Sequence, residues 1–149
     1  MSNVCAKSIT LPEVGVVDSG AYQLTIRLDK DCSLRVGALG LHSFVRGEYV
    51  YTGRASRNLK ARVERHLSKK KKLRWHIDYF LQWGKVVGVT VFPGLAESEC
   101  LINLETASNC DYVFPVQGFG SSDCRCPSHL IWARESDTGP IQRKIGTEI

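Results

Sequence analysis

The stretch YVYTGRASRNLKARVERHL, from Tyr49 to Leu67, changes from a strand pattern to a helix pattern within a few residues. Tyr49 and Tyr51 are two residues apart, so they lie on the same face of a strand that we expect to end at Gly53. The residues after Gly53 have the period of an amphipathic helix. The stretch therefore predicts a strand, a sharp turn and a helix in direct succession.

The predicted helix has two polar side chains beside its apolar stripe. Ser56 is a candidate N-cap, and we expect the helix to continue to about Lys69. Its apolar residues recur at every fourth position: Leu59, Val63 and Leu67. Arg62 and His66 are one turn apart and border this stripe, so both should face the sheet. Burying an unpaired arginine is costly, so Arg62 should meet an anion or line a cleft. The alternative is a structural ion pair beside a hydrogen-bonded histidine.

The rest of the chain predicts one α+β domain, with a small mixed or antiparallel sheet flanked by helices. Residues 21–28 alternate between apolar and polar side chains, which indicates a half-buried strand. Further strands are expected over 34–39 and 85–92, further helices over 74–83 and 97–107, and a glycine-rich loop with a short apolar segment over 118–133. We expect the domain to cover residues 20–133, after an N-terminal lead (1–19) and before a polar tail (134–149).

Positive charge is concentrated in one segment. Residues 54–74 contain ten Lys and Arg against one acid, a net charge of +9, whereas the whole chain carries +5 and the remainder therefore −4. This imbalance favours a polyanionic partner such as nucleic acid, although a solvated lysine-rich helix end is the simpler alternative. The candidate nucleic-acid-binding residues are Arg54, Arg65, Lys69, Lys70, Lys71, Lys72 and Arg74.

The N-terminus and the cysteine content favour a soluble, cytoplasmic protein. The first ten residues, MSNVCAKSIT, lack the basic start and apolar run of a signal peptide. No apolar stretch approaches the roughly 18–20 residues that span a bilayer. Six cysteines without an export signal argue against a disulfide framework. We therefore expect no membrane partner.

Two tripeptides and the helix that follows them resemble a known nuclease motif. Gly20-Ala21-Tyr22 and Tyr51-Thr52-Gly53 are similar to the two halves of the GIY-YIG signature. In that family, a helix with a catalytic arginine follows the second half. The pattern L-x-x-R-x-x-x-H places Arg62 at this position, with His66 one turn later.

The resemblance is closer to the Uri-type stand-alone branch of the GIY-YIG superfamily, and it extends from about Gly20 to Trp132. It includes the segments YVYTGRA, KLRWHIDYFL and GFGSSDCRCPSHL and the pair Glu99-Cys100. Two departures stand out. The family usually joins its two tyrosine strands by a short hairpin, whereas here an additional strand is expected between them, and Ala21 and Thr52 replace isoleucines.

By this resemblance, the chain is a metal-dependent endonuclease that hydrolyses DNA, in repair or in the processing of an unusual DNA structure. Glu99 would hold a single divalent ion, Mg²⁺ or Mn²⁺. Tyr22 would act as general base with the support of Tyr51, and nearby cations would favour its phenolate. Arg62 would neutralise the phosphate, and His66 would hydrogen-bond a tyrosine or the leaving group. The alternatives are a non-catalytic nucleic-acid-binding module and a zinc-stabilised interaction domain.

A second candidate metal site lies in the sequence DCRCPSH. Cys124, Cys126 and His129 could supply three zinc ligands, and Cys100 could complete a tetrahedral site. The compact spacing departs from the usual paired C-x-x-C arrangement, so we favour the alternative of buried thiols with a hydrogen-bonded histidine. The sequence RWHIDYF also belongs to the resemblance, but the roles of His76 and Asp78 in it stay open, with core packing favoured for His76.

Overall fold

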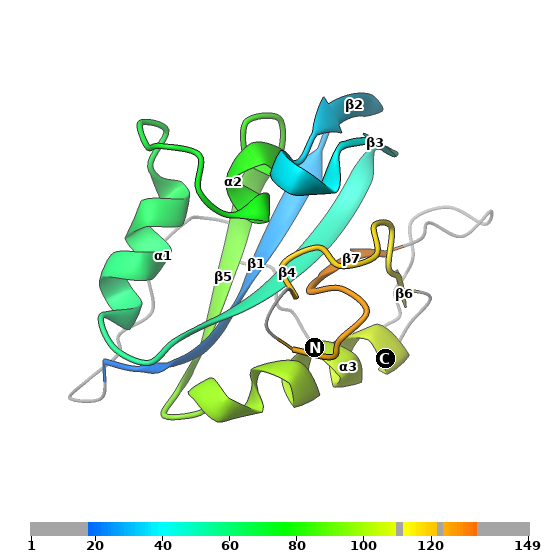
Figure 1. Cartoon of the computed structure of the whole chain (residues 1–149). Helices are drawn as coiled ribbons and strands as arrows, with labels where there is room; N and C mark the ends of the chain where they lie inside the picture. The colour runs from blue at the N-terminus through cyan, green and yellow to red at the C-terminus, as the bar shows by residue number, and fades with distance from the viewer. Residues whose placement is uncertain (1–17, 110–111, 122–123, 134–149) are drawn as a thin grey trace.

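The computed structural model describes residues 18–109, 112–121 and 124–133, which form one α+β domain (Figure 1). The predicted fold class is confirmed. The predicted C-terminal tail and all but residues 18–19 of the predicted lead lie outside the described residues.

The main sheet has five antiparallel strands in the order β5-β1-β4-β7-β6. Its strands are β1 (Gly20–Leu28), β4 (Gly47–Ala55), β5 (Lys85–Pro93), β6 (Tyr112–Val113) and β7 (Leu130–Ala133). The two tyrosine strands are neighbours in the centre of the sheet, and their register sets Tyr22 opposite Gly53. The two halves of the motif thus meet at one end of the β1–β4 pair.

A separate hairpin is inserted between these two central strands. It consists of β2 (Cys32–Arg35) and β3 (Leu41–Phe44), which are joined through the 3₁₀ turn η1 (Gly37–Leu39). The predicted strand over residues 34–39 is therefore wrong in its bounds. Gly37 has a φ of +49°, which an extended strand cannot use, so the chain turns there and returns as β3.

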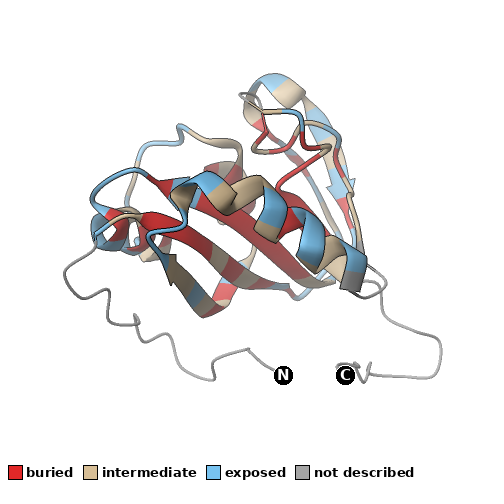
Figure 2. Cartoon of the chain, turned by 90° about the horizontal axis from the view of Figure 1, so that it is seen from below, coloured by how far each residue is buried: buried red, intermediate tan, exposed pale blue. Residues whose placement is uncertain are grey.

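Within the residues that the structure describes, three α-helices flank the sheet. They are α1 (Leu59–Leu67), α2 (His76–Phe80) and α3 (Glu99–Asn109), and the 3₁₀ turn η2 (Ala96–Ser98) leads into α3. The apolar face of β1 carries Tyr22, Leu24 and Ile26, which pack in one core with residues of α1 and α2. The opposite face of β1 carries Gln23, which donates a hydrogen bond to Thr106 of α3. Figure 2 shows α3 lying across this second face, with buried strands behind it.

All three predicted helices differ from the observed ones in their bounds. The helix predicted over 97–107 is α3, Glu99–Asn109, and it follows the 3₁₀ turn η2. The N-cap of α1 is Asn58, in the left-handed conformation, and not Ser56, and the helix ends at Leu67. Helix α2 has only five of the ten expected residues. Its start is set by Asp78, whose Oδ2 accepts hydrogen bonds from the amides of Arg74 and Trp75 and so holds these two residues outside the helix.

In the part of the chain that the structure describes, no helix has the length and apolar character needed to cross a membrane.

Candidate functional site

Four of the five predicted catalytic residues line one open pocket of about 160 Å³. Tyr22 comes from β1, Tyr51 from β4, Arg62 from α1, and Glu99 is the first residue of α3. The remaining lining residues are Gly53, Arg54, Ser56, Trp75 and Gly120. The fold therefore brings together side chains that are up to 77 positions apart in the sequence.

Gly53 makes room for the ring of Tyr22. A Cβ atom at Gly53 would lie 2.5 Å from the Tyr22 hydroxyl oxygen and 2.6 Å from its ring carbon Cζ. Real Cβ atoms do not approach other atoms so closely, so any larger residue would displace the ring. The last residue of the second tripeptide thus has a structural reason to be glycine.

Behind the pocket, His66 hydrogen-bonds Tyr22. Its Nε2 lies 2.7 Å from the Tyr22 hydroxyl oxygen, and its ring is buried between the rings of Tyr22, Tyr51 and Trp75. Burial, and to a smaller extent the nearby charge of Lys71, lower the pKa of His66 to about 3. The imidazole is therefore neutral at physiological pH.

Burial and a neighbouring cation act in opposite directions on the pKa of Tyr22. Burial raises the pKa of Tyr22 well above its usual value, and the neighbouring Tyr51 acts in the same direction. Arg62 lowers the pKa through its charge and a hydrogen bond, but this effect is smaller than the effect of burial. Arg62 thus favours the phenolate, as expected, but burial disfavours it more strongly, because the ring is almost completely withdrawn from water.

Trp75 forms an aromatic wall of the pocket that the sequence did not single out. The guanidinium carbons of Arg62 and Arg65 lie 4.7 Å and 4.3 Å from the centre of its ring. Arg62 also donates a hydrogen bond from Nη1 to the carbonyl oxygen of Arg54. The guanidinium of Arg62 is therefore held in place at the pocket by a ring on one side and a backbone oxygen on another.

Glu99 is the single carboxylate among the lining residues, and it has a partner at each oxygen. Its Oε1 lies 3.6 Å from Nε of Arg54, whose side chain is half exposed. Its Oε2 lies 3.0 Å from Nδ1 of His129, which is buried. Burial disfavours the charged form of His129, but the hydrogen bond and the charge of Glu99 outweigh burial and raise the pKa of His129 to about 10.

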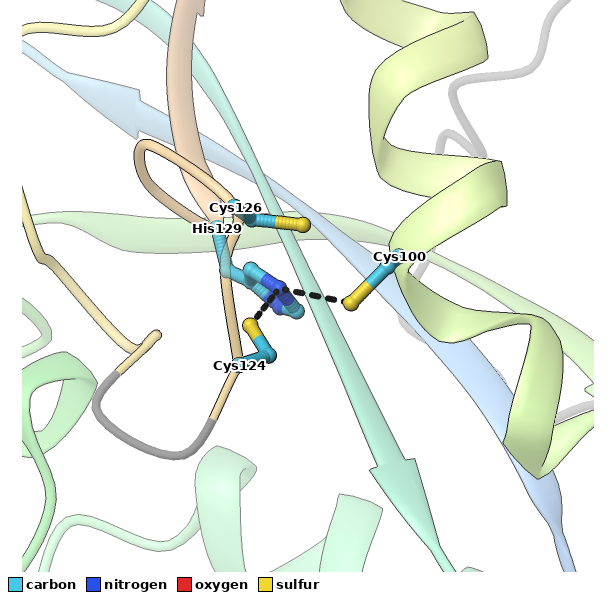
Figure 3. A group of neighbouring side chains, drawn as sticks. All are labelled: Cys100, Cys124, Cys126 and His129. Atoms are coloured by element: carbon cyan, nitrogen blue, oxygen red, sulfur yellow. Dashed lines mark hydrogen bonds between the residues drawn. The ribbon is translucent and has the colours of Figure 1, made fainter.

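The four residues of the candidate zinc cluster come together in the fold. Cys124, Cys126 and His129 lie in the loop before β7, and Cys100 lies in the first turn of α3; the three sulfur atoms surround the imidazole of His129 (Figure 3). One ligand atom from each residue lies within 4.8 Å of the other three. Nε2 of His129 is 3.3 Å from Sγ of Cys124 and 3.7 Å from Sγ of Cys100. The cluster is therefore a candidate metal-binding site.

The two cysteines of the loop differ in acidity. Burial raises the pKa of Cys124, but a hydrogen bond from the amide of Cys126, the thiol of Cys100 and the charge of His129 outweigh burial and lower it. Burial and the neighbouring sulfur atoms raise the pKa of Cys126 to about 12. The thiolate is the form that binds metals, and of these two cysteines Cys124 loses its thiol proton more readily.

Comparison with known families identifies the domain. Residues 21–146 match the family model DUF123, which is described as a domain of unknown function. The chain belongs to the DUF123 family. No curated protein and no solved structure matches the chain.

The basic residues of this DUF123 domain fall into two groups. Arg65 binds Asp78 through both terminal nitrogens, each at 2.9 Å, and also donates to the carbonyl of Lys72. Lys71 donates to the carbonyl oxygens of Arg65 and His66 at the end of α1. These contacts give Arg65 and Lys71 structural roles. The other candidates of the basic segment are exposed: Arg54, Lys69, Lys70, Lys72 and Arg74.

The two residues of RWHIDYF with open roles also make structural contacts in the DUF123 domain. Asp78 is fully buried and accepts four hydrogen bonds, two from Arg65 and two from backbone amides. His76 accepts a hydrogen bond at Nδ1 from the amide of Gly120 and so holds a lining loop of the pocket against α2. Asp78 joins two helices, and His76 supports the pocket from outside.

Sequence reasoning missed one contact of the DUF123 site, the bond between Glu99 and His129. His129 was considered only as a metal ligand, and no local pattern links it to a residue 30 positions earlier. Trp75 could have been noticed, because it lies within a segment that carried the family resemblance.

Proposed function

We propose that this DUF123 domain is a divalent-metal-dependent endonuclease that hydrolyses the phosphodiester bonds of DNA in the pocket between Tyr22, Arg62 and Glu99. One observation carries the proposal: phenol, guanidinium and carboxylate groups from three separate elements line the same open pocket. The resemblance to GIY-YIG nucleases supports the same assignment.

Arg62 is suited to bind the scissile phosphate. A guanidinium has five N–H donors in a planar fork, and the bond to the carbonyl of Arg54 uses one terminal nitrogen. The donors that face the pocket can therefore contact phosphate oxygens. Because Trp75 stacks against this group, its orientation is set before the substrate arrives.

Tyr22 would orient the attacking water and accept its proton. Nδ1 of the buried His66 has no hydrogen-bond partner among the described residues. An unpaired acceptor is tolerated better in a protein interior than an unpaired N–H. We therefore assign the proton of the neutral ring to Nε2, from which it is donated to the Tyr22 oxygen. This bond and the charge of Arg62 both stabilise the phenolate that burial disfavours.

The donor set of the pocket fits a hard divalent cation that is held mainly by water and substrate. Mg²⁺ in phosphoryl-transfer sites uses one or two carboxylates and keeps several waters. Oε1 of Glu99 meets only a long contact to the half-exposed Arg54, so this oxygen can turn to a cation, whereas Oε2 is held by His129. When bound, the ion would supply positive charge to the phosphate and to the leaving oxygen.

The test is a cleavage assay on single-stranded, duplex and branched DNA, with Mg²⁺ or with a chelator. We expect cleavage only with the metal. Arg62→Ala and Glu99→Gln should each lower the rate about 10²–10³-fold, as the loss of one charge-stabilising group typically does. Lys60→Ala is the matched control, because Lys60 is exposed on the same helix, does not line the pocket and should leave the rate unchanged.

Unchanged rates in both pocket variants would overturn the assignment. Binding of DNA without cleavage under any of these conditions would favour the non-catalytic binding module instead.

A second proposal concerns the cysteine cluster, which we assign to a structural Zn²⁺. Zinc binds sulfur at about 2.3 Å and imidazole nitrogen at about 2.0–2.1 Å in a tetrahedron, which separates a sulfur from a nitrogen ligand by about 3.5 Å. The distances from Nε2 of His129 to Cys124 and Cys100, 3.3 Å and 3.7 Å, are close to this separation. Zinc in protein purified without added metal would support the assignment, and its absence would favour hydrogen-bonded thiols.

A further inference from the structure

One histidine joins the cysteine cluster to the pocket. Nε2 of His129 faces the sulfur atoms of Cys100 and Cys124, while Nδ1 of the same ring lies 3.0 Å from Oε2 of Glu99. Glu99 and Cys100 are consecutive residues in the first turn of α3. Successive residues of a helix point about 100° apart, which lets one turn present a carboxylate to the pocket and a thiol to the cluster.

We propose that the cluster of Cys100, Cys124, Cys126 and His129, when it holds Zn²⁺, positions the carboxylate of Glu99 for a second, catalytic cation. The proposal rests on the function proposed above for the pocket. It makes His129 a positioning residue and zinc a condition for binding of the divalent ion at Glu99.

The hydrogen-bond partners of His129 fit this role. A metal on Nε2 leaves the ring proton on Nδ1, and a second-shell acceptor then fixes the orientation of the ring. Nδ1 has two acceptors within reach, Oε2 of Glu99 and the backbone oxygen of Thr52, each at 3.0 Å. With zinc on Nε2, Glu99, His129 and the metal would form a carboxylate–histidine–zinc triad, in which the carboxylate accepts the Nδ1 proton of the metal-bound histidine. Such a bond would hold one carboxylate oxygen and leave Oε1 toward the pocket.

Hydrogen bonds of the backbone around His129 connect the cluster loop to β4 and to α3. The amide of Thr52 on β4 donates to the carbonyl of His129, and the amide of His129 donates to the carbonyl of Phe119. Asn103 of α3 donates to the carbonyl of Ser128 in the cluster loop. The loop is therefore anchored to β4 and to the second turn of α3. At the first turn of α3, it is contacted by the side chains of Cys100 and Glu99.

A metal in the cluster would cross-link this first turn to the loop. Cys100 is 24 residues before Cys124, and the loop from 124 to 129 has no regular secondary structure to hold its side chains in place. Four metal–ligand bonds would fix the position of Cys100 and, through the adjacent peptide, that of Glu99. Loss of the metal would leave the carboxylate with the exposed Arg54 and with an imidazole that no metal bond holds in place.

The test measures metal content and metal binding separately from DNA cleavage. The full chain is purified without added metal, its zinc is measured by elemental analysis, and the affinity for Mn²⁺ is measured by electron paramagnetic resonance. The zinc is then removed with a zinc-selective chelator, and the Mn²⁺ titration is repeated before and after Zn²⁺ is returned. We expect one zinc per chain, Mn²⁺ binding weakened about 10–100-fold on zinc removal, which is the usual effect of losing a second-shell partner, and recovery on addition of Zn²⁺.

Recovery separates positioning from misfolding, because a chain that had unfolded irreversibly would not regain its Mn²⁺ affinity. Cys126→Ser should lower both zinc content and Mn²⁺ affinity. Its matched control is Cys32→Ser, a free cysteine of β2 outside the cluster, which should change neither. Substitution with Co²⁺ should give the visible absorption of a tetrahedral thiolate site in the wild type and not in Cys126→Ser.

Three results would have different meanings. Absence of zinc, or Mn²⁺ binding that is independent of zinc, would overturn the inference and leave the proposed nuclease function standing. Mn²⁺ binding that is unchanged in the zinc-loaded Glu99→Gln variant would overturn the proposed metal site at Glu99 itself, and the inference with it.

Discussion

His66 illustrates how strongly burial acts on one residue of this site. The ring is 3% exposed, and its pKa is lowered to about 3 by burial and by Lys71. In the unfolded chain, the same histidine takes up a proton near pH 6.5, whereas the folded protein does not until much lower pH. The folded state therefore loses stability as the pH falls from 6.5 toward 3, and the contribution of His66 is complete above pH 6.5.

This loss can be measured with a neutral replacement. A difference of one pKa unit between the two states is worth about 1.4 kcal/mol. Protonation of His66 in the unfolded chain should therefore lower the free energy of unfolding by roughly 3 kcal/mol between pH 6.5 and pH 4. Urea unfolding of wild type and His66→Gln across this range isolates the contribution, because the glutamine does not titrate. Parallel pH profiles for the two proteins would show that the imidazole is charged in the folded state.

The absence of a Cβ atom at Gly53 lets the ring of Tyr22 take its place beside the pocket. The ring of Tyr22 occupies the space that a side chain at Gly53 would need, and their strands pair these two residues directly. Sequence alone identified the glycine as part of a tripeptide, but the reason for it is the strand register, which local sequence does not specify.

At the scale of the elements, Asp78 connects α1 to α2. It accepts two hydrogen bonds from Arg65 of α1 and two from the amides that precede α2, and its side chain is fully buried. We expect Asp78→Ala to lower the free energy of unfolding by about 3–5 kcal/mol, because it leaves a partly buried guanidinium and two amides without their acceptor. Chemical denaturation measures this change.

The control for Asp78 is the exposed ion pair between Arg27 and Glu48, whose side chains are 55% and 43% exposed. Glu48→Gln should change the stability by less than about 1 kcal/mol, since water and salt screen such pairs. Equal losses in Asp78→Ala and Glu48→Gln would contradict the role of Asp78 as a buried connector.

The bounds of the elements were predictable where the pattern is local. The alternation of β1 is visible in the sequence, and its predicted bounds differ from the observed ones by one residue. The start of α1 was missed because Asp18 accepts hydrogen bonds from the amides of Leu59 and Lys60, and this partner lies some 40 residues away. Short segments such as β6 and β3 become strands by pairing with a neighbouring strand, and they are too short to show a period in the sequence.

The sequence predicted which residues make up the candidate site, but not the hydrogen bonds and ion pairs between them. The motif resemblance supplied Tyr22, Tyr51, Arg62 and Glu99, which the fold gathers at one pocket. The same reasoning assigned Arg65 and Lys71 to nucleic acid from their charge. Their partners, a buried aspartate and the last carbonyls of α1, exist only in the folded chain.

At the scale of the whole molecule, the exposed basic residues after α1 would set the salt dependence of the proposed DNA binding. Lys69, Lys70 and Lys72 are exposed, and the described contacts of their side chains do not include an acidic partner. If all three contact phosphates, their replacement by glutamine should reduce the slope of log K against log salt by about 3, because each contact contributes roughly one unit.

The measurement is a DNA-binding titration at several salt concentrations. A double variant, Lys30→Gln with Lys85→Gln, removes exposed charge elsewhere on the surface and is expected to leave the slope nearly unchanged. If the two sets of substitutions reduced the slope equally per lysine replaced, the net charge of the domain, and not this segment, would govern binding.

The position of Trp75 has an optical consequence. The chain has three tryptophans, of which Trp83 is 61% exposed and Trp132 packs over Gly47, away from the pocket residues. Trp75 alone lines the pocket, with a guanidinium over its ring. A chain in which the other two are phenylalanine would therefore carry one intrinsic fluorophore, and its emission would report directly on what enters the site.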